Sequence, residues 1–426
     1  MDLKFGLDDK PRFRDMMLYS VEWFVLAVAV VITTIFIAQG TPGEKLLYAQ
    51  KMFVVMGGAT LLQALIGHRM PLVVGPASVL LIGILTTLSS QGDSTNTDVI
   101  YTSILLCGAL LAVIAAGGLL KYIQRIFTPR IVVVIMMLLS FTLAGTIRDL
   151  IFPAHLTEQH SFGLIFTIVA IPLMAFLSSR LKGIIKSLVI PASLLIGTVI
   201  YFLRFGGFCE AFTQLSEPSG TILLPNLEFD WGIIAAFIFC YIALLINDIG
   251  SIQSLGAMVK APNMDSRVKK GVFWTGILNF VAGGVGIIGP VNYSLSPGVV
   301  AGSRCASRYT IIPTAILLII CGFIPQLVAV FASIPNTVIG VILLYLMGTQ
   351  LAAAFHVMVA ERNVLSFNDG LIIGIPVMVA LLFAIIPDGV VPQILRPIVR
   401  NGFVMGVITV ILMEHIFLKD KTLQKK

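Results

Sequence analysis

Long apolar stretches recur along the whole chain, and this recurrence most constrains what the chain can fold into. Each stretch has about 17 to 25 residues, enough to cross a hydrocarbon layer of roughly 30 Å as a helix. Hydrophobic residues make up 58% of the sequence and charged residues only 12%, which leaves too little polar surface for a soluble globule of this length. The sequence therefore predicts an all-α integral membrane protein with no separate soluble domain.

Fourteen membrane crossings are predicted from these stretches. Their approximate bounds are 18–39, 50–67, 71–89, 99–122, 129–152, 161–179, 184–204, 231–253, 268–287, 290–303, 309–332, 335–356, 367–387 and 402–418. The N-terminal segment "MDLKFGLDDKPRFRDMM" mixes acidic with basic residues and lacks a small-residue cleavage site before a short apolar core. We therefore expect that it is not a signal peptide removed by cleavage.

The distribution of Lys and Arg predicts the orientation in the membrane. If the N-terminus is cytoplasmic, all but six of the 28 Lys and Arg residues fall on the cytoplasmic side, where positive loops are favoured. The six exceptions are Lys45, Lys51, Arg148, Arg204, Arg396 and Arg400. We therefore expect a multi-pass protein of the cell inner (plasma) membrane with both termini in the cytoplasm.

Two similar interruptions divide the chain into related halves. The third predicted span contains "MPLVVGPAS" and the tenth contains "GPVNYSLSPGVV", so that Pro71 matches Pro290 and Pro76 matches Pro297. Seven crossings per half is an odd number, so the two halves must lie in the membrane with opposite orientation. Inverted repeats with interrupted helices at matching places are typical of secondary transporters.

The interruptions predict helices that begin inside the membrane. Gly75-Pro76 and Ser296-Pro297, the latter followed by Gly298, have the form of a helix cap and a first helical residue, and the residues before them can run extended. A half-helix N-terminus presents free N–H groups and partial positive charge to a ligand with carbonyl oxygens. An ordinary proline kink is the alternative, but its occurrence at two matching places favours interrupted helices.

Few acids fall inside the predicted spans. Asp248 lies late in the eighth span beside Asn247 and Ser251, and Glu22 lies early in the first span, its counterpart under inverted symmetry. A desolvated carboxyl there can load and release a proton and so drive symport. Two alternatives stay open, because Glu22 could be a solvated acid at the membrane edge and Asn247 could bond a neighbouring helix.

Other kinds of site find little support in the sequence. The five cysteines are scattered and odd in number, which suggests neither a disulfide framework nor a metal cluster. They are Cys107, Cys209, Cys240, Cys305 and Cys321. No HExxH motif, His-rich cluster or Ser/His pair points to an intramembrane enzyme. We therefore expect no enzyme activity, no cofactor, no metal and no nucleic-acid partner, whereas a channel stays open as an alternative to a transporter.

Four motifs resemble the nucleobase-ascorbate transporter family, the uracil and xanthine permeases, across nearly the whole chain. They are "SVEW", "MPLVVGPAS", "INDIGSIQSLGAMV" and "NYSLSPGVVAGSR". The resemblance implies a seven-plus-seven inverted repeat in which a core domain moves against a gate domain, commonly in a homodimer. It divides the chain into core parts at 1–122 and 231–332, gate parts at 123–205 and 333–426, and an external linker at 206–230.

The chain departs from this family at the motifs that hold the substrate. Glu22-Trp23 stands where Gln-His is usual, and Asn247 stands where a glutamate is usual. In the tenth span, the residues at 295–298 ("LSPG") align with a Gln-Asn or Glu-Asn pair followed by one residue and glycine. Carried over position by position, the resemblance places five residues at the substrate. They are Ser78, Asn247, Ser251, Leu295 and Ser296.

The resemblance implies proton- or sodium-coupled transport, with a proton favoured here because acids lie at depth. We expect symport of a nucleobase, uracil-like or xanthine-like, or of a related small polar heterocycle, by alternating access. Asp248 or Glu22 is expected to replace the missing glutamate as the protonatable group. The alternative is an anion carrier resembling the sulfate transporters, which are expected to share this architecture, although Asp248 speaks against it.

Overall fold

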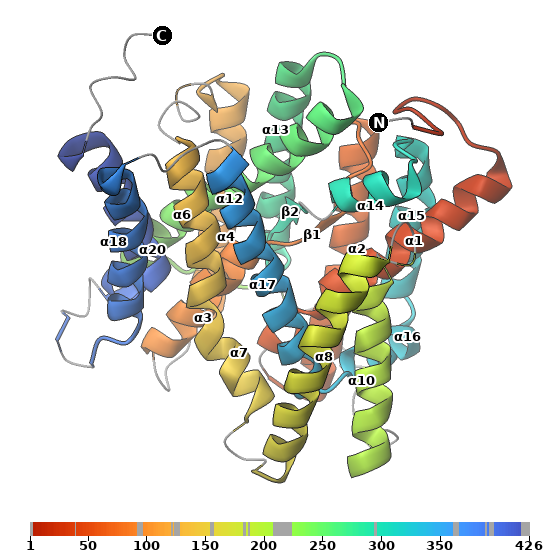
Figure 1. The fold of residues 1–426 in the computed structure, drawn as a ribbon, viewed down its shortest axis with the longest axis horizontal. Helices are drawn as coiled ribbons and strands as arrows, with labels where there is room; N and C mark the ends of the chain where they lie inside the picture. Colours follow the sequence, from red (N-terminus) through yellow and green to blue (C-terminus); the bar gives the residue numbers. More distant parts are fainter. Residues whose placement is uncertain are drawn as a thin grey trace.

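A computed structural model shows a mostly helical molecule with one two-stranded sheet near its middle (Figure 1). The structure describes residues 3–38, 40–91, 97–120, 122, 128–153, 157–181, 185, 188–207, 224–293, 296–360, 366–387, 390–391 and 396–418. Among these residues, seven helices are long and apolar enough to cross a membrane, or eight if one pair bent by 95° forms a single span. The remaining predicted crossings coincide with the less apolar long helices Pro42–Leu65 and Met264–Gly284, with shorter helices, or with a strand followed by a short helix.

The first group of helices surrounds the sheet. Its elements are α1 (Phe13–Ile32), η1 (Ile35–Ile37), α2 (Pro42–Leu65), β1 (Val74–Pro76), α3 (Ser78–Gln91), α4 (Thr97–Ala116), α12 (Trp231–Val259), α13 (Met264–Gly284), β2 (Pro290–Asn292), α14 (Ser296–Ser303), η4 (Arg308–Thr310), α15 (Ile311–Gly322) and α16 (Pro325–Ala332). Within it α13 packs along α4, α15 along α2, and α12 against both α3 and α4. Elements from both halves of the sequence are therefore interleaved in one body.

The second group packs mainly on itself. Its elements are α6 (Pro129–Thr142), α7 (Ala144–Ile151), η3 (Thr157–Gln159), α8 (His160–Arg180), α10 (Val189–Phe205), α17 (Asn336–Ala360), α18 (Phe367–Ala384), α19 (Arg396–Val399), α20 (Gly402–Leu412) and the π-helical turn η6 (Met413–Phe417). Here α17 packs on α6 and α7, and α18 on α20 and α6. The short α19 also touches α12 and α3 of the first group.

Each predicted crossing coincides with a helix, a broken helix or a strand followed by a helix, so the predicted fold class is confirmed. Two crossings contain breaks that the sequence patterns above do not predict. The fifth crossing is divided into α6 and α7, and the eleventh into α15 and α16, with a bend of 95° between its two parts. Pro325 opens α16 and explains the second break, since proline is favoured in the first turn of a helix.

The two interrupted spans meet as antiparallel strands. Val74 pairs with Asn292 and Gly75 with Val291, and the ladder continues beyond the strands through Ala77 N–H, which donates to Gly289 O at 2.9 Å. The predicted extended segments in the third and tenth spans are thus confirmed. Pairing across the two halves satisfies backbone groups that cannot be left open at membrane depth.

The predicted helix start at Gly75-Pro76 is wrong by two residues. Both residues belong to β1, and α3 begins at Ser78. The reason is the sheet itself, because Gly75 pairs with Val291. Pro76 faces Pro290 at the end of the ladder, where neither residue has an N–H group to lose.

In the other half, α14 begins at Ser296, followed by Pro297 and Gly298, which agrees with the predicted start. The Ser296 hydroxyl accepts a hydrogen bond from the N–H of Val73 at 3.0 Å and so ties α14 to the first interrupted span. Leu295, which precedes this helix, lies outside the described residues.

A buried ion cluster joins three helices of the second group. Arg130 Nη1 lies 3.1 Å from Asp369 Oδ1 and 3.5 Å from Glu414 Oε2, and all three side chains are largely buried. These residues come from α6, α18 and η6. Because separating buried charges is costly, the cluster holds this end of the second group together.

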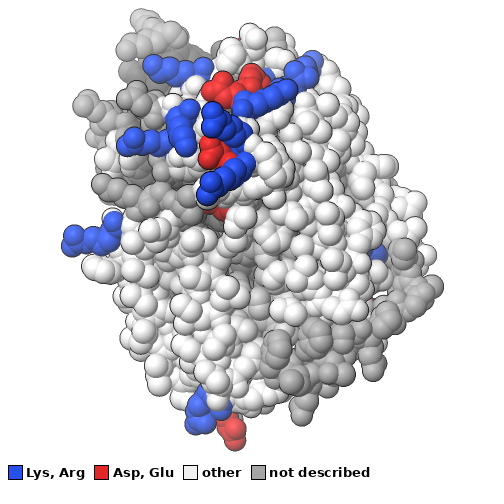
Figure 2. Space-filling model, turned by 90° about the vertical axis from the view of Figure 1, so that its right-hand side faces the viewer, with Lys and Arg blue, Asp and Glu red and all other residues white. Residues whose placement is uncertain are grey.

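The surface is consistent with a lipid environment. On the face shown in Figure 2, most charged side chains gather towards the upper end, and a largely uncharged band separates them from a small cluster at the lower end. Large apolar side chains on α8 and α10 are exposed, for example Ile165 at 62% and Leu203 at 82%. Such faces are stable in hydrocarbon and unfavourable in water.

We expect Gly75→Ala to destabilise the strand crossing. A Cβ atom at this position would lie 2.6 Å from Val30 Cγ1 and 2.9 Å from Tyr293 Cε2, so the packed neighbours must move. Overpacking of this kind costs roughly 1–3 kcal/mol, which thermal unfolding of the detergent-solubilised protein would report as a lower melting temperature. Gly58→Ala on α2 is the matched control, since its Cβ would meet no atom within 4 Å. Equal melting temperatures for both variants would contradict close packing at β1.

Candidate functional site

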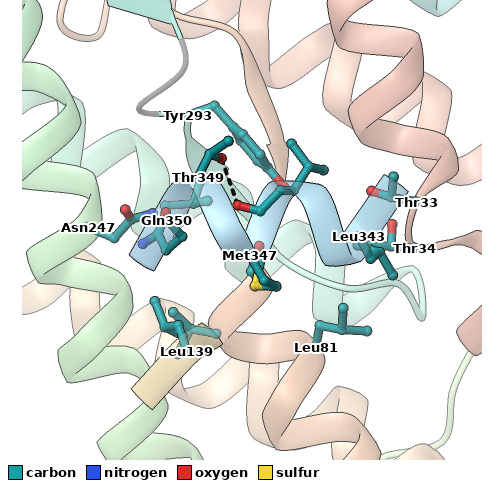
Figure 3. A pocket seen from close by; sticks show the side chains of 14 residues that line it. Thr33, Thr34, Leu81, Leu139, Asn247, Tyr293, Leu343, Met347, Thr349 and Gln350 are labelled. Carbon is teal, nitrogen blue, oxygen red and sulfur yellow. Dashed lines mark hydrogen bonds between the residues drawn. The ribbon is translucent and has the colours of Figure 1, made fainter. Parts of the chain in front are cut away.

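A cavity lies where the sheet meets both helix groups (Figure 3). The first group contributes Thr33 and Thr34 at the end of α1, Ser78, Val79 and Leu81 of α3, Asn247 of α12, and Val291 and Tyr293 at β2. The second group contributes Leu139 of α6 and Leu343, Leu346, Met347, Thr349 and Gln350 of α17. None of these described lining residues carries a charge. The cavity encloses about 60 Å³.

Four hydroxyl groups of the cavity donate to backbone carbonyls. The bonds are Thr33 Oγ1 to Val30 O (2.7 Å), Thr34 Oγ1 to Val31 O (3.1 Å), Thr349 Oγ1 to Leu346 O (2.7 Å) and Tyr293 OH to Pro76 O (2.8 Å). Because each hydroxyl proton is already used, these groups offer a ligand their oxygen lone pairs. They are therefore suited to a ligand that donates N–H groups.

Two side-chain amides complete the polar lining. Asn247 and Gln350 come from opposite helix groups, and Figure 3 shows them towards the same end of the cavity, away from Thr33 and Thr34. Within the described part of the chain, neither amide makes a hydrogen bond. Each amide offers both a donor and an acceptor. Leu139 and Leu81 supply apolar surface on another side of the cavity.

The buried acid Asp248 faces away from this cavity, into the first group. Its Oδ1 atom accepts from the N–H of Asn292 at 3.1 Å and from Asn292 Nδ2 at 2.8 Å. Its Oδ2 atom accepts from Thr275 Oγ1 at 2.9 Å. The carboxyl is fully buried, and its hydrogen-bond partners in the described structure include no cation. It thus joins α12 to α13 and β2 through neutral donors.

The hydrogen bonds around Asp248 form an array that extends to His68 on one side and to Gln63 on the other. His68 Nε2 lies 3.0 Å from Asn292 Oδ1, and His68 Nδ1 accepts from the N–H of Met70 at 3.0 Å. Since Nδ1 is an acceptor, Nε2 carries the proton and donates to Asn292. On the other side, Gln63 Nε2 donates to Thr275 Oγ1 at 3.0 Å. His68, Asn292 and Gln63 are fully buried.

The predicted substrate residues are distributed unevenly around the cavity. Ser78 and Asn247 line it, whereas Ser251 is buried on α12 and donates to the carbonyl oxygen of Asn247 at 2.8 Å. Ser296 lies outside the lining and bonds Val73, as described above. Asn247 is thus both a cavity residue and a neighbour of the buried acid in sequence.

Glu22 is not among the residues that line the cavity. It lies in α1 between Ser20 and Trp23, both of which bond Thr310 of η4: Ser20 Oγ donates to Thr310 O at 2.6 Å and Trp23 Nε1 donates to Thr310 Oγ1 at 3.2 Å. Its exposed fraction is 2%, which argues against the solvated position that the sequence left open.

Several residues of the site were not predicted. Gln350 and Thr349 are isolated polar residues in the apolar α17, and no motif distinguishes them in the sequence. His68 directly precedes "RMPLVVGPAS", and Asn292 stands inside the tenth-span interruption, so proximity to an interruption was the available signal. Thr275 carries no sequence signal, because its role depends on the packing of α13 against α12. Among the described residues, no group of three or more His, Cys, Asp or Glu could hold a metal ion.

Comparisons with known proteins agree with this architecture. A family model, Xan_ur_permease, described as a permease family, matches residues 14–389. Xanthine permease XanQ of Escherichia coli (strain K12) is 24% identical, with 96% of this chain and 94% of that protein covered. Putative purine permease YwdJ of Bacillus subtilis (strain 168) is 23% identical, with 93% and 94% covered.

A third relative and two solved structures extend the comparison. Putative purine permease CPE0397 of Clostridium perfringens (strain 13 / Type A) is 29% identical, over 54% of this chain and 52% of that protein. The transmembrane domain of the cyanobacterium bicarbonate transporter BicA has a TM-score of 0.59 at 13% identity, with 95% and 100% covered. The murine anion transporter Slc26a9 in the inward-facing state has a TM-score of 0.62 at 13% identity, with 95% and 69% covered. These two likenesses concern the fold alone.

We expect Asp248→Asn to be tolerated and Asp248→Leu to be strongly destabilising. An asparagine oxygen can still accept from Asn292, and its amide can donate to Thr275 Oγ1. Leucine leaves the two donors of Asn292, its backbone N–H and its side-chain amide, buried without their acceptor, which costs about 1–3 kcal/mol for each group. Thermal unfolding in detergent measures the difference, and equal melting temperatures for the two variants would contradict the described array.

Proposed function

The chain belongs to the Xan_ur_permease family of permeases, and we propose that it carries a neutral nucleobase across the membrane as a proton-coupled secondary transporter. The chain is a multi-pass membrane permease and not an enzyme. The uncharged polar cavity at the meeting point of the two interrupted spans carries the proposal. Its similarity to a putative purine permease and to a xanthine permease supports a nucleobase as the substrate.

The chemistry of the cavity suits a flat heterocycle with alternating carbonyl and N–H groups. Side-chain amides recognise such edges through paired donor and acceptor atoms, as Asn and Gln do with adenine in DNA. Asn247 and Gln350 provide two such amides, and the Thr33 and Thr34 oxygens can accept N–H groups at the other end. The Tyr293 ring and the leucine side chains provide apolar contact for the faces of the ring.

Loading this cavity requires movement between the two helix groups. Its volume of about 60 Å³ is far below the roughly 300–1,000 Å³ of typical small-molecule pockets. Asn247 lies on the first group and Gln350 on the second, so separation of the groups widens the site. We propose alternating access, with a core at 1–122 and 231–332 moving against a gate at 123–205 and 333–426, and 206–230 as an external linker.

Asp248 is the proposed coupling group. A proton on its carboxyl alters the hydrogen bonds that join α12 to α13 and β2, and Tyr293, next to β2, lines the cavity. Hydrogen-bond donors surround both carboxyl oxygens, whereas a sodium ion would need further oxygen ligands there. A proton is therefore the favoured coupling ion, and Glu22, buried in α1, is the second candidate.

The anion-carrier alternative shares the fold of the solved bicarbonate and anion transporters. No Lys or Arg is among the described residues that line the cavity, so an anion would find only neutral dipoles there. This favours a neutral substrate.

The proposed setting is the plasma membrane, with both termini cytoplasmic and two copies forming a homodimer. The charge distribution along the sequence supports the orientation. The exposed apolar faces of α8 and α10 suit contact with lipid or with a second copy.

We expect Asn247→Ala and Gln350→Ala each to weaken nucleobase uptake about 3-fold to 10-fold, the value of one neutral hydrogen bond. Gln326→Ala on α16 is the matched control, because this exposed amide is not among the cavity residues. Uptake of radiolabelled uracil and xanthine into proteoliposomes, with purines, pyrimidines, ascorbate and small anions as competitors, measures the effect. Competition by bicarbonate or sulfate, without competition by any nucleobase, would support the anion carrier and contradict the proposal.

We expect Asp248→Asn to abolish accumulation driven by a pH gradient while preserving substrate exchange, because exchange needs no net proton movement. Glu22→Gln is the matched comparison and is expected to keep gradient-driven accumulation if Asp248 is the coupling group. Accumulation and counterflow are measured with the same labelled substrate at several external pH values. Retained pH-dependent uptake by both variants would refute coupling through either acid.

A further inference from the structure

We infer that Oδ2 is the atom of Asp248 that takes up the proton, and that His68 and Thr275 are positioning residues that determine this choice. The inference rests on the proposed proton coupling at Asp248. The described residues around Asp248 supply known donors and acceptors, and these determine the direction of each hydrogen bond near the acid.

The first step is the orientation of His68. The N–H of Met70 can only donate, so His68 Nδ1 is an acceptor and Nε2 carries the hydrogen. Nε2 then donates to Asn292 Oδ1 at 3.0 Å, which leaves the amide nitrogen of Asn292 facing the acid. Asp248 Oδ1 therefore receives two hydrogens, one from that amide and one from the N–H of Asn292.

A proton on Oδ1 would have to point at these two donors. Turning the Asn292 amide does not help, because its nitrogen would then meet the hydrogen on His68 Nε2. A change of tautomer at His68 would place a second hydrogen against the N–H of Met70. The array thus holds Oδ1 as a permanent acceptor, whichever protonation state Asp248 adopts.

Unlike Oδ1, Oδ2 has a partner that can change from hydrogen-bond donor to acceptor. Its hydrogen-bond partner in the described structure is the Thr275 hydroxyl, at 2.9 Å, and a hydroxyl can rotate about its C–O bond. Gly271 O lies four residues earlier on α13, where a threonine commonly bonds back to its own helix. Gln63 Nε2 donates to both Gly271 O (2.9 Å) and Thr275 Oγ1 (3.0 Å), so these two oxygens lie close together.

The protonated state can then be written without leaving a polar group unpaired. The incoming proton bonds to Oδ2, the new O–H donates to Thr275 Oγ1, and the threonine hydrogen turns to Gly271 O. No other covalent bond changes. Loss of the negative charge also weakens the two charge-assisted bonds from Asn292, which loosens the hold of α12 on β2.

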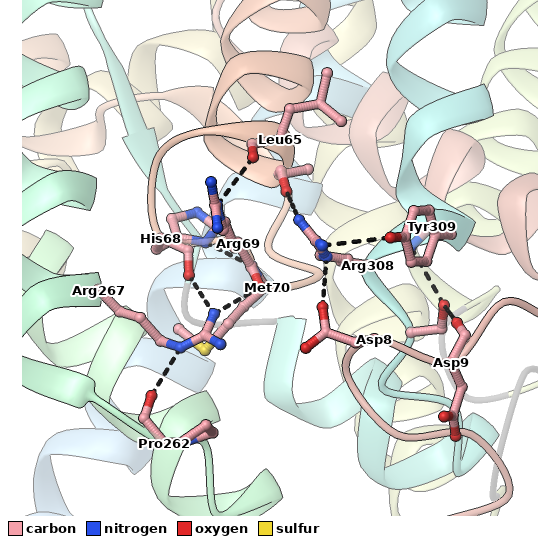
Figure 4. A network of polar contacts seen from close by, with 12 residues as sticks. Asp8, Asp9, Leu65, His68, Arg69, Met70, Pro262, Arg267, Arg308 and Tyr309 are labelled. Atoms are coloured by element: carbon pink, nitrogen blue, oxygen red, sulfur yellow. Dashed lines mark hydrogen bonds and ion pairs between the residues drawn. The ribbon is translucent and has the colours of Figure 1, made fainter.

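Burial, with a smaller contribution from the charge of Arg267, lowers the pKa of His68 to about 3 and keeps the ring neutral. Arg267 of α13 donates through Nη1 to the carbonyl oxygens of His68 (2.8 Å) and Arg69 (3.0 Å), as Figure 4 shows. The positive charge of Arg267 opposes a further positive charge on the ring. On the α12 side, the neutral phenol of Tyr241 donates to Asn279 Oδ1 of α13 at 2.8 Å.

Infrared titration of the full-length protein tests the assignment without measuring transport. The carboxyl C=O band of protonated Asp248 is identified by its loss in Asp248→Asn. With the proton on Oδ2, the C=O group is Oδ1, so Asn292→Ala removes one of its donors and raises the band frequency. Thr275→Val leaves that frequency unchanged but moves the titration midpoint up by about one pH unit. Both forms lose their bond to Thr275, but the bond of the ionised carboxylate is charge-assisted and therefore the stronger of the two.

Thr275→Ser keeps the hydroxyl and is the matched control, expected to titrate like the wild type, and melting temperatures show that each variant is folded. A higher C=O frequency in Thr275→Val, with none in Asn292→Ala, would assign the proton to Oδ1 and overturn the inference. The absence of an Asp248 band between about pH 4 and pH 9 would overturn both this inference and the proposed coupling. A band that titrates as expected, in a protein that shows no proton-driven uptake, would refute the proposed function alone.

Discussion

The structure depends on the requirement that backbone amides inside a membrane be paired within the protein. A chain with prolines and glycines in two of its spans cannot pair them all within helices. Here the broken segments pair with each other, as β1 and β2, and the hydroxyl of Ser296 binds the additional N–H of Val73. The close approach of Tyr293 and Val30 to Gly75 shows how tightly this crossing is packed.

The strand pairing also determines where the polar groups of the site can lie. Asn292 ends β2 and reaches Asp248 with both its backbone and its side chain, while the following Tyr293 lines the cavity. A single strand thus connects the buried acid with the cavity wall. The ion cluster of Arg130 lies near the starts of α6 and α18 and at η6, where it stabilises the second group of helices.

Much of this fold follows from hydrophobic patterning, and the exceptions have physical causes. The spans and both interruptions are local features, so apolar length and the positions of proline predict them. The start of α3 was misplaced because strand pairing with Val291, a residue of the other half, overrides the capping preference of Gly75-Pro76. The partners of Asp248 and the cavity position of Gln350 depend on helix packing between distant parts of the chain, which no local pattern reports.

The arrangement of neighbouring residues on α12 suggests why an acid one position away can serve where the usual glutamate is absent. Successive helix residues point about 100° apart, so Asn247 faces the cavity while Asp248 faces α13 and β2. A neutral amide at the cavity avoids placing an uncompensated charge beside a neutral ligand. In the proposed mechanism, substrate and proton therefore occupy separate sites, and the rigid turn of α12 between them carries the coupling. In this proposal, a ligand that draws Asn247 towards Gln350 also moves the helix that the carboxyl of Asp248 anchors.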